Sequence, residues 1–110
     1  MSELNAAELR LAHHARDGSL VLTVTGELDL ASAGELEAYV NELRPMSAPL
    51  AIDVSGVLFV DSSGLRALNR ARLAAIEDTG EPVILLGCGK TLRKLLTITG
   101  LSAAFPGLDD

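Results

Sequence analysis

The sequence of 110 residues contains no tryptophan, only one tyrosine and only two phenylalanines. A hydrophobic core must therefore be built from leucine, valine, isoleucine and alanine. Platforms that stack single-stranded nucleic acid are made of aromatic side chains, so this composition argues against such a platform. The hydrophobic content of 48% and the charged content of 22% are those of a folded globular chain and not of a disordered one.

Basic side chains are also scarce, because nine Lys and Arg stand against fifteen Asp and Glu and the net charge is −6 at pH 7. An acidic chain is a poor ligand for polyanions, so we expect no direct nucleic-acid binding and no membrane binding. Residues 1–55 carry three basic and nine acidic side chains, whereas residues 56–110 carry six of each. Electrostatic steering by the first half would favour a basic partner.

Cys88 is the single cysteine, which excludes an intramolecular disulfide and provides no metal-ligand spacing. No apolar run approaches the roughly 18 residues of a membrane span, and the first residues lack the features of a signal peptide. We therefore expect a cytoplasmic protein. His13 and His14 are adjacent on a predicted strand and point to opposite faces, so we expect one packed and one solvated histidine and no metal site.

Hydrophobic periodicity and turn signals predict a single α/β domain over residues 1–110, with frayed ends at about 1–6 and 107–110. A hairpin followed by βα units implies a mixed, mostly parallel sheet with right-handed crossover helices packed on it. Ser32 is the expected cap of the first helix, and 82–87 is expected to be a central strand. The elements follow the order β-β-α-β-α-β-α, with strands at 8–14, 19–30, 48–55 and 82–87 and helices at 31–44, 64–78 and 90–100.

Two patterns that suggest catalysis or nucleotide binding are incomplete. A serine-hydrolase elbow around Ser62 would require glycine at position 60, which is valine. The stretch GCGKT resembles a phosphate loop, but Ile84 and Leu92 stand where the two nucleotide-binding fingerprints require glycine. It is predicted to be a strand-to-helix turn with Lys90 on the surface. We therefore expect no catalytic residue and no enzyme.

Three acidic residues, Asp29, Asp53 and Asp61, each lie near the end of a predicted strand. They could converge at one edge of the sheet, where receiver domains of response regulators hold Mg²⁺ for aspartyl phosphorylation. Such a domain requires an acidic pair after its first strand and a longer βα repeat. The acids are therefore a weak signal for this chemistry.

The stretch VLFVDSSGL places a carboxylate and two hydroxyls where a helix begins. One serine, most simply Ser63, would cap the helix, while Asp61 complements the helix dipole. Ser62 would then remain free, with Gly64 leaving the backbone unshielded and Leu65 near the surface. A free hydroxyl at a helix start suits a protein kinase, because a phosphate there can accept the free N–H groups of the first turn. An ordinary cap and a modification site both remain open at this point.

The chain resembles the bacterial anti-sigma factor antagonists, which are single STAS domains. The resemblance rests on GELD at 26–29, LAIDVSGVLFVDSSGLRAL at 50–68, GEPVILLG at 80–87 and LLTITGL at 95–101. The most specific part is the aliphatic strand followed by DSSGL and a helix. The resemblance implies a STAS fold and a partner-switching protein without chemistry of its own.

In this family the unphosphorylated antagonist binds an anti-sigma factor, which is a serine kinase of the histidine-kinase-like ATPase fold, and thereby frees a sigma factor. The resemblance implies that the kinase phosphorylates Ser62 and that a serine phosphatase restores binding. ATP and Mg²⁺ would belong to the kinase, and the chain itself would hold no cofactor and be a monomer or weak dimer when alone. The implied contact surface comprises Asp29, Asp61, Ser62, Ser63, Gly64, Leu65 and Arg66.

One feature of the sequence leaves the identity of the partner open. Arg66, Arg70 and Arg72 stand on the helix after the motif, where many members of the family are more apolar. The alternative function is that of a STAS-fold accessory subunit of a transporter or other ATPase complex, in which the serine is not a substrate.

Overall fold

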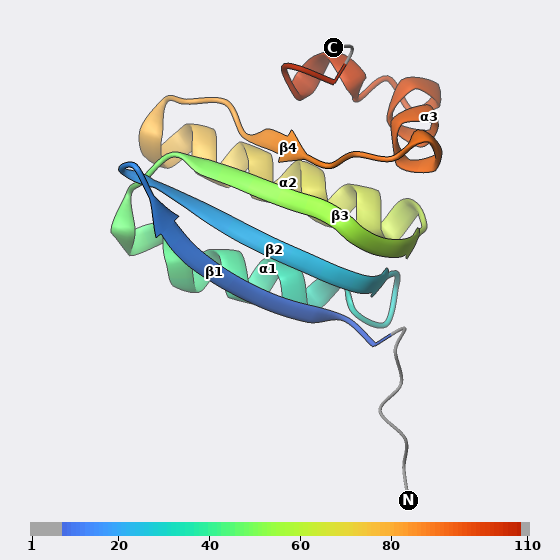
Figure 1. Ribbon diagram of the computed structural model, residues 1–110, viewed down its shortest axis with the longest axis horizontal. Coiled ribbons are helices and arrows are strands. Elements are labelled where there is room, and N and C mark those ends of the chain that lie inside the picture. The colour runs from blue at the N-terminus through green and yellow to red at the C-terminus, as the bar shows by residue number, and fades with distance from the viewer. Residues whose placement is uncertain (1–7, 109–110) are drawn as a thin grey trace, which may run out of the picture.

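The computed structural model describes residues 8–108, and in this range four strands form one sheet that is accompanied by three α-helices (Figure 1). Strand β1 is antiparallel to β2, whereas β2 and β3, and then β3 and β4, are parallel. The predicted β-β-α-β-α-β-α order and mixed sheet are confirmed. The elements are β1 (Arg10–Arg16), β2 (Ser19–Leu28), α1 (Ala33–Leu43), β3 (Leu50–Val60), α2 (Ser62–Thr79), β4 (Ile84–Leu86) and α3 (Lys90–Ile98).

A tight turn at Asp17 and Gly18 joins β1 to β2. Both residues have a positive φ, +51° and +83° respectively. This is the backbone of a type I′ hairpin turn, which the Asp-Gly pair favours because glycine has no Cβ to clash and aspartate tolerates the left-handed region. The turn predicted from the sequence is therefore confirmed.

The core lies between the sheet and the two helices α1 and α2, which cover the same face of the sheet (Figure 1). Leu22 and Ile52 from the sheet, Leu36 from α1 and Leu68 from α2 are almost completely buried. Phe105 joins them from the C-terminal segment. The scarcity of aromatic residues in the sequence therefore yields a core that is aliphatic except at one position.

The prediction of a central strand at 82–87 is wrong, because β4 is the edge strand of the sheet. It pairs with β3 alone among the described residues. Ile84 lies on the face of the sheet away from the core and is 43% exposed, whereas Leu85 packs inward and is 7% exposed. The run is apolar on both faces although only one of them is buried here, so its apolar character did not identify a central strand.

The C-terminal segment packs on the core. Helix α3 is followed by Gly100 at φ +78°, as predicted for a helix terminator. Leu108, which lies in the range 107–110 expected to fray, is only 3% exposed and packs on the core. The expectations for 1–6 and for 109 and 110 concern residues outside the described range.

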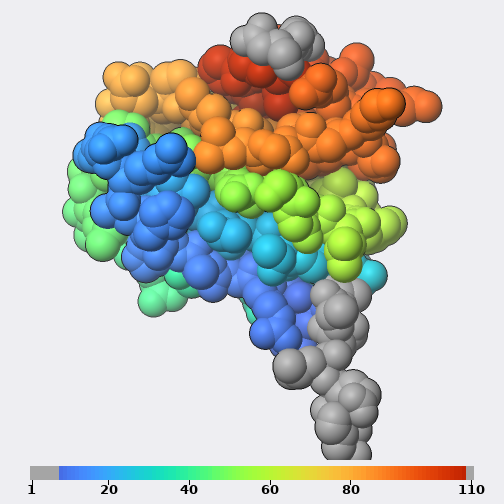
Figure 2. All heavy atoms as spheres, in the orientation of Figure 1, coloured from blue at the N-terminus to red at the C-terminus, as the bar shows by residue number. Residues whose placement is uncertain are grey.

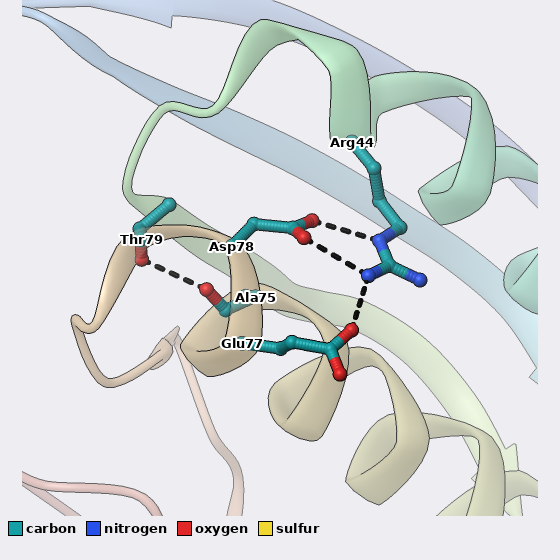
Figure 3. A network of polar contacts seen from close by, with 5 residues as sticks. All are labelled: Arg44, Ala75, Glu77, Asp78 and Thr79. Carbon is teal, nitrogen blue, oxygen red and sulfur yellow. Dashed lines mark hydrogen bonds and ion pairs between the residues drawn. The ribbon is translucent and has the colours of Figure 1, made fainter.

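An ion-pair cluster fastens α1 to the far end of α2 (Figure 3). Arg44, in the short 3₁₀ turn that follows α1, donates from Nε to Asp78 Oδ2 at 2.7 Å and from Nη2 to Asp78 Oδ1 at 2.9 Å. The same Nη2 contacts Glu77 Oε1 at 2.6 Å. The hydrogen bonds from Arg44 lower the pKa of Asp78 below its usual range. The cluster fixes the C-terminal end of α2, whose N-terminal end carries the site described next.

Candidate functional site

Parallel pairing places the ends of β2 and β3 side by side, with Leu28 opposite Val60. The residues that follow them, Asp29 and Asp61, therefore emerge at the same edge of the sheet. The backbone N–H of Asp61 donates to the carbonyl oxygen of Leu28 at 3.3 Å, which ties the two ends together. The sequence prediction that these two acids converge is confirmed.

Asp53 does not join them. It lies within the sheet, opposite Thr23 on β2 and Leu86 on β4. Its Oδ1 accepts hydrogen bonds from the backbone N–H and the hydroxyl of Ser55 at 3.0 and 2.7 Å. The expected cluster of three acids is therefore wrong, because β3 continues well beyond Asp53. Between residues 8 and 108, no three His, Cys, Asp or Glu side chains are close enough to hold a metal ion.

Asp61 is the N-cap of α2, so the prediction that Ser63 caps this helix is wrong. Oδ1 of Asp61 accepts from the backbone N–H of Gly64 at 2.9 Å, and Oδ2 accepts from the backbone N–H of Leu30 at 3.2 Å. Asp61 has an extended backbone, whereas Ser62 is the first helical residue. A carboxylate has two oxygens, so one side chain both caps the helix and holds the loop that follows β2.

We expect Asp61→Ala to lower the free energy of unfolding by about 1–2 kcal/mol, because it removes the cap and the link to Leu30. Ser63→Ala is the matched control and should change stability by less than about 0.5 kcal/mol. Urea unfolding followed by circular dichroism measures both. A larger loss for Ser63→Ala than for Asp61→Ala would contradict the assignment of the cap.

Ser62 is exposed at the start of α2, and Ser63 is half-buried beside it. Neither hydroxyl forms a hydrogen bond with another residue in the described part of the chain. The first N–H groups of a helix have no partner within the helix, and here the carboxylate of Asp61 takes only that of Gly64. Arg66 stands exposed one helical turn after Ser62. The hydroxyl of Ser62 is therefore accessible and adjacent to free donors.

Gly64 and Leu65 are buried, which corrects the expectation of an unshielded backbone and a surface leucine. Leu65 is 5% exposed and belongs to the core. A Cβ on Gly64 would overlap the carbonyl oxygen of Leu28 and lie 2.7 Å from Cγ2 of Val60. Gly64 thus allows α2 to start directly against the ends of β2 and β3. These two residues fix the position of Ser62 and offer little side-chain surface themselves.

The loop between β2 and α1 is held by Asp29 and Ser32. Oδ1 of Asp29 accepts from the backbone N–H groups of Ala31 and Ser32 at 3.1 and 3.2 Å. The buried hydroxyl of Ser32 donates to the carbonyl oxygen of Glu27 at 2.8 Å. Ser32 is the N-cap residue of α1, as predicted, but its hydroxyl accepts no hydrogen bond from the first turn of that helix. The resulting loop leaves Leu30 79% exposed.

Three exposed apolar side chains near this edge were not identified from the sequence. They are Leu30, Leu58 at 68% exposure and Phe59 at 51% exposure. Leu58 and Phe59 belong to β3, which continues to Val60 and so extends beyond the strand predicted at 48–55. The sequence did contain a signal for this exposure, because consecutive apolar residues interrupt the two-residue period of a strand with one buried face.

The structure also places the histidines, the GCGKT stretch and Cys88, which the sequence analysis had considered. His13 and His14 are both exposed, so the expectation of one packed and one solvated histidine is wrong, although His13 Nδ1 lies 2.8 Å from the hydroxyl of Tyr39. GCGKT forms the predicted turn into α3, with Lys90 exposed. Burial raises the pKa of the Cys88 thiol, although Arg93 acts in the opposite direction. A raised pKa disfavours the thiolate that a nucleophilic cysteine requires.

Comparison with known proteins agrees with this geometry. The family model of the STAS domain matches residues 10–109, so the chain belongs to the STAS domain family. The anti-sigma-F factor antagonist RsfB of Mycobacterium tuberculosis is 31% identical over an alignment of 110 positions that covers 89% of this chain and 88% of RsfB. The chain is thus related to anti-sigma factor antagonists.

Solved structures show the same fold. An anti-sigma factor antagonist from Mycobacterium paratuberculosis superposes with a TM-score of 0.74 at 31% identity, covering 93% of this chain and 86% of that one. The Bacillus cell fate determinant SpoIIAA in its phosphorylated form has a TM-score of 0.65 at 22% identity, covering 89% and 88%. The expected α/β STAS fold is therefore confirmed. None of the helices between residues 8 and 108 is both long and apolar enough to cross a membrane.

Proposed function

We propose that this chain is an anti-sigma factor antagonist of the cytoplasm, a binding protein without chemistry of its own. In its unphosphorylated form it would bind an anti-sigma factor that is also a serine kinase, and so release a sigma factor. Phosphorylation of Ser62 would end that binding. The observation that carries the proposal is the exposed hydroxyl of Ser62, which has no hydrogen-bond partner among the described residues.

The surroundings of Ser62 suit a hydroxyl that is modified rather than one that stabilises the fold. Because Asp61 supplies the cap, the helix does not depend on Ser62. A phosphate at this position could accept hydrogen bonds from the free N–H groups of the first turn. The fold would therefore tolerate the modification, while the local surface would gain about 1.5–2 negative charges. SpoIIAA, whose structure in a phosphorylated form has the same fold, supports this compatibility.

The same edge offers a surface for the partner. Leu30 supplies exposed apolar area, and Asp29 and Asp61 are half-buried acids on either side of the junction between the two strands. Arg66 adds a positive charge one turn away from Ser62. Under this proposal ATP and Mg²⁺ belong to the partner kinase, and a serine phosphatase returns the chain to its binding form.

The proposal is tested by incubating the chain with candidate anti-sigma factor kinases and ATP, followed by intact mass and site mapping. We expect the wild-type chain to gain the mass of one phosphoryl group on Ser62. Ser62→Ala should gain none and still bind the kinase. Phosphate found only on Ser63, or a wild-type chain that neither binds nor is modified by any such kinase, would contradict the proposal and favour an accessory-subunit function.

A further inference from the structure

A groove lies between the second half of β3 and the start of α3, with a volume of about 220 Å³. Phe59 and Leu58, the two exposed apolar residues of β3, form part of one wall, and Lys90 and Thr91 form part of the other. Figure 2 shows the end of β3 in yellow-green and the start of α3 in orange on the same face of the molecule. Exposed aromatic and aliphatic side chains beside a groove are typical of an interaction surface.

The α3 wall of the groove carries a positive charge, whereas the chain as a whole is acidic. Residues 82–108 contain three basic side chains and no acidic one, whereas the net charge of the full chain is −6. Lys90 is the one charged side chain among the residues that line the groove. The N-terminal end of α3 adds the positive end of a helix dipole. The groove is therefore apolar on one side and electropositive on the other.

We propose that this groove docks a segment of the anti-sigma factor in which apolar side chains stand next to carboxylates. This inference rests on the proposed function and extends the contact surface beyond the residues around Ser62. Val60 lines the groove and precedes Ser62 by two residues, a span of at most about 7 Å along the chain. One partner can therefore cover both. The electropositive wall selects an acidic segment over a basic one.

The groove differs from the Ser62 edge in what it contributes. Phosphate on Ser62 changes the charge beside the helix start, while the groove keeps its apolar wall and its lysine. Binding in the groove supplies contact area and electrostatic attraction that are present in both forms of the protein. Ser62 then decides whether the complete interface can form.

The test compares Lys90→Glu with Lys94→Glu in titration calorimetry against the purified anti-sigma factor. Both variants reverse one exposed lysine of α3, but only Lys90 lines the groove. We expect Lys90→Glu to weaken the complex by about tenfold or more, and Lys94→Glu by less than about threefold. Phe59→Ser should also weaken it by about tenfold. Circular dichroism and the thermal midpoint establish that each variant is folded.

The outcomes separate this inference from the proposed function. Equal losses for Lys90→Glu and Lys94→Glu would indicate general electrostatics and overturn the groove. Unchanged affinity of Lys90→Glu and Phe59→Ser, with Ser62→Asp weakened, would overturn the groove and leave the proposed function standing. Failure of the wild-type chain to bind would overturn both. If Lys90→Glu or Phe59→Ser lost a self-association that the wild-type chain shows in sedimentation, but bound the partner as tightly as the wild type, the groove would be assigned to a second copy of the chain. That result would overturn the inference.

Discussion

Phosphorylation of Ser62 is expected to weaken the complex with the anti-sigma factor kinase by about a hundredfold or more. The unmodified hydroxyl is exposed and free of hydrogen bonds within the described residues, so a partner can close over it as a neutral group. A phosphate dianion would then have to be desolvated next to Asp61 and next to the nucleotide phosphates of the kinase. Such a penalty of several kcal/mol corresponds to a factor of a hundred or more in affinity.

Titration calorimetry with the purified partner measures this effect. Ser62→Asp carries one charge instead of nearly two, and we expect it to weaken the complex by a smaller but measurable factor of about ten. Ser62→Ala should retain wild-type affinity. Ser63→Asp is the positional control, because Ser63 is the next residue in the chain and its side chain is half-buried. If Ser62→Asp binds as tightly as the wild type, the electrostatic switch is contradicted.

The second large effect is expected from Gly64→Ala, which should lower the free energy of unfolding by about 3 kcal/mol. Its Cβ would overlap the carbonyl oxygen of Leu28, which is part of the backbone and cannot rotate away as a side chain can. Helix α2 would have to move away from the end of β2. That displacement would stretch the hydrogen bond between Asp61 and Leu30 and shift Ser62 on the surface.

Gly34→Ala is the matched control, because Gly34 is also a glycine near the start of a helix, in α1. A Cβ at Gly34 would meet no atom within 4 Å. Alanine favours the helix over glycine by up to about 1 kcal/mol, so this variant should be as stable as the wild type or more stable. Chemical unfolding of both variants measures the difference. Equal stabilities of Gly64→Ala and the wild type would contradict the close packing of α2 against β2.

Much of the fold follows from local patterns in the sequence. The Asp17-Gly18 pair specifies a type I′ turn because its backbone angles suit these two residues. Gly100 ends α3 for a similar reason. The order of strands and helices follows from hydrophobic periodicity, which directly reflects the side of each element that is buried. Such features depend on neighbours along the chain and were therefore predictable.

The candidate site was predictable only in part. The motif DSSGL located the helix start and the hydroxyl that faces solvent, and the parallel order of β2 and β3 brought Asp29 and Asp61 together. The cap was assigned to Ser63 because serine is a common cap and stands inside the motif. The structure assigns it to Asp61, since its carboxylate also reaches the backbone of Leu30 across the two loops. That second contact joins residues far apart in sequence.

The sequence by itself determined the family, the order of the elements and the position of an accessible serine at a helix start, because each depends on residues close together along the chain. Only the tertiary structure decided which groups surround Ser62. The close approach of α2 to β2 buries Gly64 and Leu65, and the continuation of β3 to Val60 exposes Leu58 and Phe59 beside α3. Burial and pairing between distant segments depend on how those segments pack together, and a local sequence pattern carries no information about that packing.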